Sequence, residues 1–351
     1  MNINEKLEKI RMVAPGTKLR SAIDNMIKGH GGALIYITKS PDNNSLIQLG
    51  FKIDCDLTPE KLYELSKMDG AIVISNDVKR ILFANVHLIP DPSIPSSETG
   101  MRHMAAERIA IQSEEMTICI SETRSTVTIY CGTWKYKLNE TPLLIEKVTQ
   151  VLQTLNKYFE TFQSYVEELS MLEIENRVVL FDVGRVFEKG IRALKIISDL
   201  EFNLAELGDE GKIAAIRVNE LKEEIENTLQ LLLMDYTSTT EPENPAALLE
   251  DLVKSTSKDT ATYLDVFDYL GYPSSQISVG EQIVSPRGYR LIMKIPRMPI
   301  SIAKNVVKKF RKFNILLKAS QKKLQEVEGI GEKRALGIVM EIKALKRKVS
   351  I

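Results

Sequence analysis

The sequence predicts a multidomain fold: an α/β domain in residues 1–141, a helical spine in 142–285 and an all-α module in 286–351. Before Pro142, short β-branched and apolar runs alternate with helical patterns, which is typical of an α/β domain. After Pro142 the next proline is Pro242, so the interval between them can form long helices. The remaining stretch is basic and contains a Gly-Ile-Gly turn between helical patterns.

The composition is that of a soluble globular protein, because 44% of the 351 residues are hydrophobic and 27% are charged. No apolar run reaches the ~20 residues of a membrane span, and the first residues lack the apolar core of a secretion signal. Cys55, Cys119 and Cys131 form no CxxC pair, which favours a reducing compartment over disulfides or a structural zinc site. We therefore expect a cytoplasmic protein without a membrane segment.

The charge is unevenly distributed along the chain. From Arg287 to the end there are 18 Lys and Arg residues against 4 Asp and Glu, a surplus of +14 that leaves −14 on the rest, because the whole chain is neutral. A basic tail on an acidic body favours a polyanionic partner for the tail, although a merely solvated Lys-rich surface would also account for it.

In the α/β domain, six short runs predict strands: "GALIYIT", "GAIVIS", "ILFANVHLI", "MTICIS", "TVTIYC" and "WKYKL". Two stretches, "TPEKLYELSKM" and "HMAAERIAIQ", predict helices. The first of these has Thr58 to cap it, Pro59 at the first helical position and Glu60 to favour the dipole. The loop "IPDPSIPSSETG" contains three prolines, which exclude regular structure, and loops of this kind often bind ligands.

In the spine, apolar residues recur at alternating steps of three and four, which predicts one apolar stripe on a long helix. The stripe consists of Val148, Val151, Leu152, Leu155, Phe159, Phe162, Val166 and Leu169. This pattern indicates a helical bundle rather than a catalytic site. The polar segment "DYTSTTEPENPAA" (235–247), with two prolines, is the most linker-like part of the chain.

The basic tail contains "LQEVEGIGEKRALGIV", a tight turn between two apolar-periodic helices. The second helix begins at Glu332, and the free backbone N–H groups of a helix start form an anion site. This pattern resembles the helix-hairpin-helix motif, which grips the DNA backbone without reading bases. By that resemblance the contacts come from Gly329, Ile330, Gly331, Lys333 and Arg334. The preceding "IPRMPISIAKNVVKKFRKFNILLKAS" looks like a degenerate first copy.

Two other interpretations of the turn were weighed. A dinucleotide-binding loop is disfavoured, because position 334 is arginine rather than the third glycine and no strand precedes the turn. A purely structural helical hairpin remains open, although the flanking lysines and the charge surplus argue against it.

The residues of the α/β domain alone identify no chemistry. No P-loop is present, His30, His87 and His103 are too scattered for a metal cage, and the Asp69-Gly70 pair is a common turn.

The motifs taken together, however, resemble a known family, the DNA integrity scanning proteins. They are "LYELSKMDGAIVIS", "ANVHLIPDPSIP", "ETG-RH--AER", "IENRVVLFDV", "SPRGYRLI" and "VEGIGEKRA", which cover the chain in the family's order. The family consists of bacterial diadenylate cyclases with an N-terminal α/β cyclase domain, a helical spine and a C-terminal helix-hairpin-helix module. The resemblance implies a mixed central sheet in the first domain and an octamer joined through the spine.

The resemblance also implies a reaction: two ATP molecules face each other across a dimer interface and condense into cyclic di-AMP and two pyrophosphates. Asp69 would hold the ribose 3′-hydroxyl and a Mg²⁺ or Mn²⁺ ion, and Arg102 and His103 would meet the phosphates at a helix start. Asp69, Arg102 and His103 are the catalytic candidates. The nucleotide-binding candidates are Gly70, Ala71, Leu88, Met101, Arg102, His103, Met104, Ala105, Ser121 and Arg124. Branched or damaged DNA bound to the tail would regulate the output.

The chain departs from the family pattern Gly-Thr-Arg-His-Arg-Thr, because it reads Gly100-Met101-Arg102-His103-Met104-Ala105. Methionine offers phosphate no useful hydrogen bond, and each lost charge-assisted contact costs ~1.5–3 kcal/mol. We therefore expect reduced activity, unless both methionines simply pack inward. "SETR" (121–124) also carries less positive charge than its counterpart in the family.

These departures keep a second function open: a DNA-binding scaffold whose degenerate cyclase domain senses ATP or cyclic di-AMP. A DNA-repair nuclease is disfavoured, because the sequence contains no recognisable cluster of acidic metal ligands.

Overall fold

A computed structural model describes residues 1–40, 45–48, 50–238, 242–256, 263–272 and 279–349. The chain forms two compact units, one of Met1–Thr149 with Leu200–Ala215 and one of Gln150–Asp199 with Ile216–Ile351. Helices α6 (Leu180–Leu207) and α7 (Lys212–Tyr236), which a short 3-10 helix η1 (Gly208–Gly211) connects, contribute residues to both units. The boundaries of the three predicted domains therefore stay a prediction.

The first unit is built on a mixed sheet, as expected. Its strands are β1 (Ala33–Thr38), β2 (Ile47–Gln48), β3 (Phe51–Asp56), β4 (Ala71–Ser75), β5 (Arg80–Leu88), β6 (Met116–Ile120), β7 (Val127–Cys131) and β8 (Trp134–Lys137). Among the described residues their order is β2-β5-β4-β1-β6-β7-β8, with β3 also pairing with β5. Strands β1 and β4 run parallel and the other pairs antiparallel.

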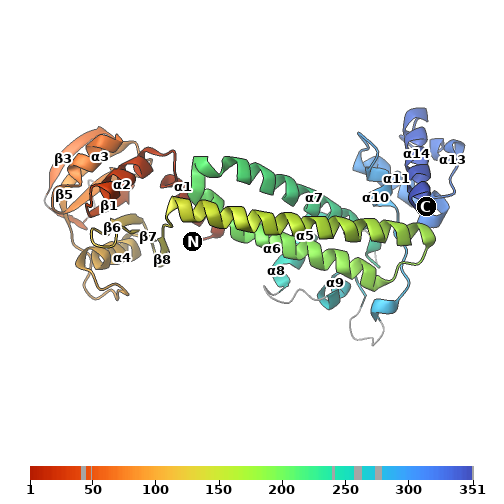
Figure 1. Cartoon of the computed structure of the whole chain (residues 1–351), viewed down its shortest axis with the longest axis horizontal. Coiled ribbons are helices and arrows are strands. Elements are labelled where there is room, and N and C mark those ends of the chain that lie inside the picture. The colour runs from red at the N-terminus through yellow and green to blue at the C-terminus, as the bar shows by residue number, and fades with distance from the viewer. Residues whose placement is uncertain (41–44, 49, 239–241, 257–262, 273–278, 350–351) are drawn as a thin grey trace. The chain divides into compact units, whose positions relative to one another are not determined.

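Helices cover both faces of this sheet (Figure 1). The residues of the central strand β1 alternate between two cores, as the two-residue period of a strand requires. Ala33, Ile35 and Ile37 pack with α2 (Lys18–Lys28) and α3 (Pro59–Leu65). Leu34 and Tyr36 pack on the other face, with α4 (Met101–Ser113). The α/β prediction is thus confirmed, and α4 is held against the strands that form the site below.

Four elements of this unit were not foreseen: the strands β2 and β3 and the helices α1 (Ile3–Met12) and α2. In β3 most side chains are exposed, so the strand lacks the apolar run from which a buried strand is predicted. Helix α1 begins with a capping box, in which the Asn2 side chain accepts from the Glu5 N–H and the Glu5 carboxylate accepts from the Asn2 N–H.

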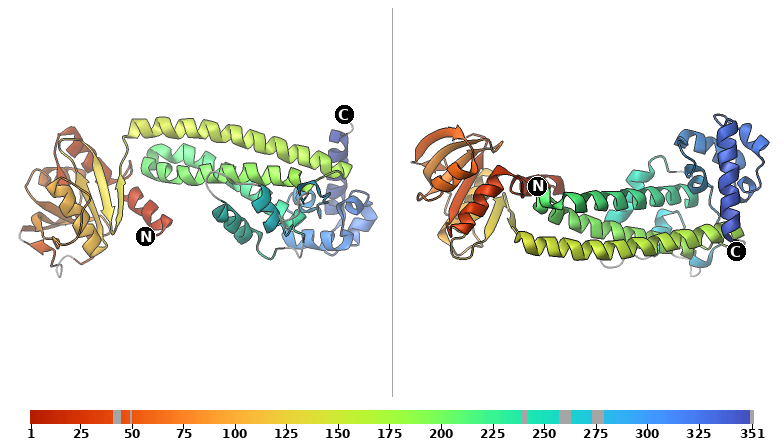
Figure 2. Two further views of the ribbon diagram at one scale, coloured as in Figure 1. Left: turned by 90° about the horizontal axis from the view of Figure 1, so that it is seen from below. Right: turned by 45° about the horizontal axis from the view of Figure 1, so that its top comes forward.

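The predicted spine is a set of long helices: α5 (Thr141–Glu175), α6 and α7 (Figure 2). The apolar stripe faces the interior, because Leu155, Phe159 and Phe162 are at most 6% exposed. At Gly190 a Cβ would lie 2.9 Å from Leu229 Cδ1 and 3.0 Å from Phe162 Cε2, so glycine allows the three helices to approach closely.

The predicted linker begins too early. Asp235 and Tyr236 form the last turn of α7 and are 2% and 1% exposed, and residues 239–241 lie outside the described residues. The polar composition of the segment concealed this, because the Asp235 carboxylate is satisfied by N–H groups more than fifty residues further along the chain.

The chain then continues through α8 (Pro245–Ser255), α9 (Tyr263–Tyr269) and a short 3-10 helix η2 (Val279–Glu281) into the basic module. That module contains α10 (Tyr289–Met293), α11 (Ile300–Phe310), α12 (Phe313–Leu316), α13 (Gln321–Gln325) and α14 (Glu332–Val349) around one apolar core. The predicted short helices of the tail are confirmed. None of the described helices combines the length and apolarity needed to cross a membrane.

Candidate functional site

A pocket of about 310 Å³ opens where β4 begins, β5 ends and α4 begins. Six of the predicted nucleotide-binding residues line it: Gly70, Ala71, Leu88, Met101, Arg102 and Ala105. Leu34, Val86, His87 and Ile89 complete the lining and were not predicted. Asp69, His103, Met104, Ser121 and Arg124 are not part of this lining, although Asp69, His103 and Met104 neighbour lining residues in the sequence and the charge of Arg124 acts on His103.

Gly70 allows the start of β4, which lines the pocket, to approach β5 closely. Its φ is +88°, and a Cβ would lie 2.8 Å from the Val86 carbonyl oxygen on β5, so only glycine fits. The Asp-Gly pair therefore turns the chain into β4 at close range to β5. Asp69, which directly precedes this turn, is exposed. Its carboxylate is therefore accessible to a ligand, next in sequence to the lining residue Gly70.

The N-terminus of α4 provides the polar side of the pocket. Gly100 is the N-cap, no side chain caps the helix and the first turn contains no acidic residue. The N–H groups of that turn and the positive end of the helix dipole therefore face an anion site. Arg102 and His103 add basic side chains to the same turn. This arrangement suits a phosphate chain.

Gly32 is a site residue that the sequence did not reveal. A Cβ at Gly32 would lie 2.2 Å from Arg102 Nη1 and 3.2 Å from Glu122 Cβ. The missing side chain thus makes room for the Arg102 guanidinium between β1 and the turn that follows β6. The only signal in the sequence is the "GHGG" stretch before β1, which reads as an ordinary turn.

Glu98 is a second unpredicted residue, and it influences His103. The loop before α4 is fastened to the helix by Glu107, which accepts from the Ser97 N–H at 2.8 Å. Glu98 in this loop accepts from Tyr130 Oη at 2.9 Å and from Lys135 Nζ. Burial opposes ionisation of Glu98, but these two hydrogen bonds prevail and lower its pKa.

His103 is electrostatically unlike an exposed histidine. Burial lowers its pKa below the ordinary 6.5, and the charges of Lys135, Arg102 and Arg124 act in the same direction, while Glu98 opposes them. The imidazole is therefore neutral at neutral pH. Arg124 is therefore close enough for its charge to act on His103.

The turn after β6 holds the remaining predicted residues. The Ser121 hydroxyl accepts from the Arg124 N–H at 3.3 Å, and the Ser121 N–H donates to the Thr126 carbonyl at 2.9 Å. Glu122 in this turn flanks Gly32, so the turn lies beside the Arg102 guanidinium. The side chain of Ser121 thus shapes the turn, while Arg124 is exposed.

The two methionines differ in their surroundings. Met101 is 81% exposed and lines the pocket, so the idea that both methionines pack inward is wrong for this one. Met104 is partly buried. An exposed apolar side chain at the mouth of a polar pocket contributes no hydrogen bond to a phosphate.

A divalent ion fits this site only if one carboxylate and the substrate phosphates hold it together. Among the described residues no three His, Cys, Asp or Glu side chains come together as a metal cage. A lone exposed carboxylate such as Asp69 suits Mg²⁺ or Mn²⁺ shared with substrate phosphates, since Mg²⁺ is commonly bound by one or two carboxylates and phosphate oxygens.

The predicted hairpin of the basic module has the expected geometry. Gly329 has φ +82°, and a Cβ there would approach Ile302 Cδ1 to 3.0 Å, while Ile330 is 5% exposed and part of the core. A Cβ on Gly331 would meet no atom within 4 Å, so the backbone at the start of α14 is open to a ligand. Arg334 Nη1 donates to the Gly329 carbonyl at 2.8 Å, and this residue therefore also stabilises the hairpin itself.

The proposed first copy repeats this geometry 32 residues earlier. Arg297 has φ +58° where Gly329 has +82°, and Met298 is 6% exposed where Ile330 is 5% exposed. The Met298 N–H donates to Ile295 O at 3.2 Å, as the Ile330 N–H donates to Val327 O at 3.0 Å. Pro299 stands in the place of Gly331 and has no N–H to offer a phosphate. The first hairpin thus has the backbone geometry of the second, but it offers a phosphate one backbone N–H donor fewer.

Comparisons with known proteins find relatives over almost the whole chain. The model described as DisA bacterial checkpoint controller nucleotide-binding matches residues 20–133, its linker region matches 138–279, and the SAM-like Helix-hairpin-helix tandem matches 289–344. The DNA integrity scanning protein DisA of Thermotoga petrophila is 44% identical over 98% of both chains. That of Thermotoga maritima is 43% identical over 98% of this chain and 96% of its own, and that of Acetivibrio thermocellus 41% over 95% and 92%. The chain therefore belongs to the family of DNA integrity scanning proteins.

Proposed function

We propose that this protein is a diadenylate cyclase that condenses two ATP molecules into cyclic di-AMP. Each ribose 3′-hydroxyl attacks the α-phosphate of the facing ATP, so two phosphodiester bonds form and two pyrophosphates leave. The observation that carries the proposal is the pocket in which Gly70 and Ala71 meet Arg102 at an uncapped helix start. The match of residues 20–133 to a nucleotide-binding region supports it.

In this mechanism the chain mainly positions the reactants and neutralises charge. Gly70 and Ala71 let the ribose and base approach the backbone, and Leu88 packs against the adenine. Arg102, His103 and the N–H groups of α4 bind the triphosphate. Asp69 holds the 3′-hydroxyl and a Mg²⁺ or Mn²⁺ ion, which supplies positive charge to the phosphate oxygens. Ser121 and Arg124 lie beside the same phosphates.

One protomer provides half of such a site, so the reaction requires a homo-oligomer in which two pockets face each other. The family resemblance suggests an octamer joined through the spine. The C-terminal module binds the backbone of branched or damaged DNA through Gly329, Ile330, Gly331, Lys333 and Arg334, and this binding lowers cyclase output. The open backbone at Gly331 supports the DNA contact.

The purified protein, incubated with ATP and Mg²⁺ or Mn²⁺, is expected to form cyclic di-AMP, detected by mass spectrometry. The double variant Met101→Thr/Met104→Arg should form it roughly 10- to 100-fold faster, because it restores one hydroxyl and one guanidinium contact. The variant Asp69→Asn, in which the carboxylate charge is removed, serves as the inactive control.

A product signal from the unaltered protein would confirm the cyclase. If only the double variant makes product while the unaltered protein still binds ATP, the second candidate function, a nucleotide sensor with a degenerate cyclase domain, replaces it. The exposed Met101 in the pocket favours that candidate. If neither protein makes product or binds nucleotide, both functions are wrong.

ATP binding is expected to take up protons near pH 6.5 through His103. The pKa of this imidazole lies below 6.5 in the free protein and rises when a triphosphate approaches, so ATP affinity increases as the pH falls toward 6. Calorimetry in two buffers of different ionisation enthalpy measures the uptake. The variant His103→Gln should lose the part of it that His103 contributes, whereas the protonation of ATP itself remains. Equal proton uptake in both proteins would contradict the prediction.

A further inference from the structure

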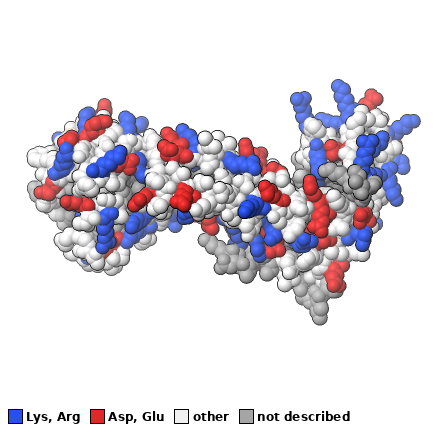
Figure 3. Space-filling model, in the orientation of Figure 1, with Lys and Arg blue, Asp and Glu red and all other residues white. Residues whose placement is uncertain are grey.

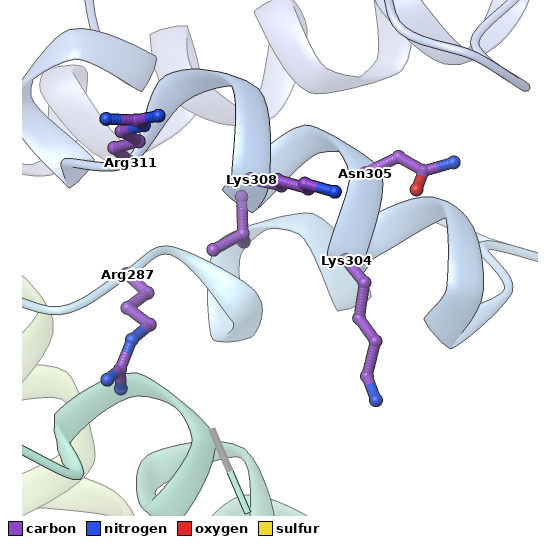
Figure 4. A pocket seen from close by; sticks show the side chains of 6 residues that line it. Arg287, Lys304, Asn305, Lys308 and Arg311 are labelled. Atoms are coloured by element: carbon purple, nitrogen blue, oxygen red, sulfur yellow. The ribbon is translucent and has the colours of Figure 1, made fainter. Parts of the chain in front are cut away.

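A basic pocket of about 440 Å³ lies on α11 (Figure 4). Its lining consists of Arg287, Lys304, Asn305, Val307, Lys308 and Arg311. Four of these six side chains are cationic and none is acidic. Lys304 and Lys308 project from α11, Arg311 directly follows this helix, and Arg287 comes from the segment before α10 (Figure 4).

No acidic side chain in the described part of the chain neutralises the positive charge of Lys304, Lys308 and Arg311. Lys304, Lys308 and Arg311 are exposed and form no ion pair with a described residue, whereas their neighbour Lys309 pairs with Glu326 at 2.7 Å. A spacing of four residues places Lys304 and Lys308 on one face of α11, and Arg311 follows directly after the helix end, so like charges repel around the pocket. An anion that occupies the pocket would remove this repulsion.

Arg287 is held in a defined position. Its Nη1 donates to the Met234 carbonyl at 2.9 Å and its Nη2 to the Thr237 carbonyl at 2.6 Å. These two hydrogen bonds fix a guanidinium in the pocket lining before any ligand arrives, which lowers the entropic cost of binding.

Lys304 and Lys308 lie on a different face of α11 from the one that supports the hairpin, and Asn305 lies at the border between the two faces. Asn305 Nδ2 donates to the Glu328 carbonyl at 3.4 Å, and Ile302 Cδ1 would lie 3.0 Å from a Cβ on Gly329. Residues 302, 305 and 309 thus face the hairpin, and at 3.6 residues per turn the centre of the cationic face lies roughly a third of a turn away. One ligand segment at the hairpin therefore does not fill this pocket.

We propose that this pocket is a second phosphate-binding site for the nucleic-acid backbone, which lets the module hold two backbone segments at once. The inference rests on the proposed DNA binding. Lys304 and Lys308 are about 6 Å apart along the helix, at 1.5 Å per residue, and Arg311 follows beyond the helix end, a spread that suits successive phosphates of a strand better than one free phosphate. The lining contains no aromatic side chain on which a base could stack, so recognition is through phosphate alone. Lys and Arg side chains gather over this end of the chain (Figure 3).

The test is a titration of the full-length protein with a fluorescent four-way junction between 50 and 200 mM salt. The triple variant Lys304→Gln/Lys308→Gln/Arg311→Gln should bind roughly ten-fold or more weakly, and its log–log salt slope should be about 2.7 smaller, because each lost phosphate contact contributes ~0.9. The control Lys147→Gln/Lys157→Gln/Lys212→Gln removes the same charge outside the module and should bind as the unaltered protein does. Thermal melting of each variant verifies folding.

Each other outcome overturns the proposal. If the unaltered protein binds the junction and the triple variant matches it in affinity and slope, the second site is wrong while DNA binding stands. If the control loses as much affinity, the overall positive charge of the protein determines DNA binding, and the pocket does not. If the triple variant keeps the junction but loses inorganic tripolyphosphate, the pocket binds a free polyphosphate instead. If the unaltered protein binds no junction, the proposed DNA binding itself fails.

Discussion

Replacing Arg102 with methionine is expected to lower the rate of cyclic di-AMP formation by roughly 10³- to 10⁵-fold, the loss typical of an arginine that acts on a phosphoryl transition state. Methionine fills much of the same volume, so the change removes the charge and the hydrogen bonds rather than the packing. Arg102 lines the pocket at the uncapped start of α4, and with Met101 and Met104 beside it, it is the only guanidinium of that helical turn.

The companion variant Gly32→Ala tests the position of the guanidinium without removing it. A Cβ on Gly32 would lie 2.2 Å from Arg102 Nη1, so the side chain must move. A displacement of about 1 Å of a catalytic group can cost ~10²-fold, and we expect a loss of that order. The rate of cyclic di-AMP formation at saturating ATP measures both variants.

The two results constrain each other. If Arg102→Met retains activity within ten-fold of the unaltered protein, Arg102 is not the charge that the transition state requires. If Gly32→Ala has no effect while Arg102→Met is inactive, the guanidinium adopts another position during the reaction. A lowered melting temperature of Gly32→Ala alone would show that the β1 contact matters to folding and not to chemistry.

The sequence predicts those parts of the site that depend on neighbouring residues, and not those that depend on contacts between residues far apart in the chain. Gly70 and the start of α4 were predictable, because a tight turn and a helix N-terminus are written in adjacent residues. Gly32 and Glu98 were not, since Gly32 meets Arg102 seventy residues away and Glu98 accepts from Lys135 thirty-seven residues away. No periodicity links such positions. The chemistry itself followed from the family resemblance, because the Asp69-Gly70 pair alone reads as a turn.

The fold was predictable where burial is one-sided or complete. The buried strand β1 and the apolar stripe of α5 follow from their patterns, and the hairpin of Gly329 and Gly331 follows from its glycines. The exposed edge strand β3 was missed, because most of its side chains are exposed and no continuous apolar run marks it. Arg297 shows another limit: it takes the left-handed conformation of the first hairpin, φ +58°, without being glycine.

Asp235 is likewise a residue whose type does not predict its place, because this charged side chain is buried. Its replacement by alanine is expected to lower the free energy of unfolding by about 3–5 kcal/mol. The buried carboxylate accepts from the N–H groups of Gly288, Tyr289 and Arg290 at 2.7, 2.7 and 3.1 Å. Alanine would leave these three donors at the start of α10 buried without an acceptor.

The same substitution would disturb a buried ion pair. Arg290 Nη2 donates to Glu173 Oε2 at 3.2 Å and to Ser170 Oγ at 2.6 Å, and the Asp235 charge helps to balance this guanidinium. Urea unfolding and the hydrogen-exchange protection of the amides at 288–290 measure the loss. The exposed control Asp251→Ala should change the stability by no more than about 0.5 kcal/mol. Unchanged protection at 288–290 would contradict the capping role.

The dependence of this effect on pH separates burial from hydrogen bonding. Burial and the nearby Glu173 raise the pKa of Asp235 to about 6, against the opposing N–H groups and the charge of Arg290. Because the folded-state pKa lies above the ordinary 3.8, the folded protein binds the proton more tightly, and the stability that Asp235 contributes falls as the pH rises from 3.8 to about 6. The variant Asp235→Asn cannot ionise, so the stability advantage of the unaltered protein over it should shrink across this range. An advantage that grows with pH would mean that the three N–H donors and Arg290 outweigh burial, and that the ionised carboxylate is the form that stabilises the start of α10.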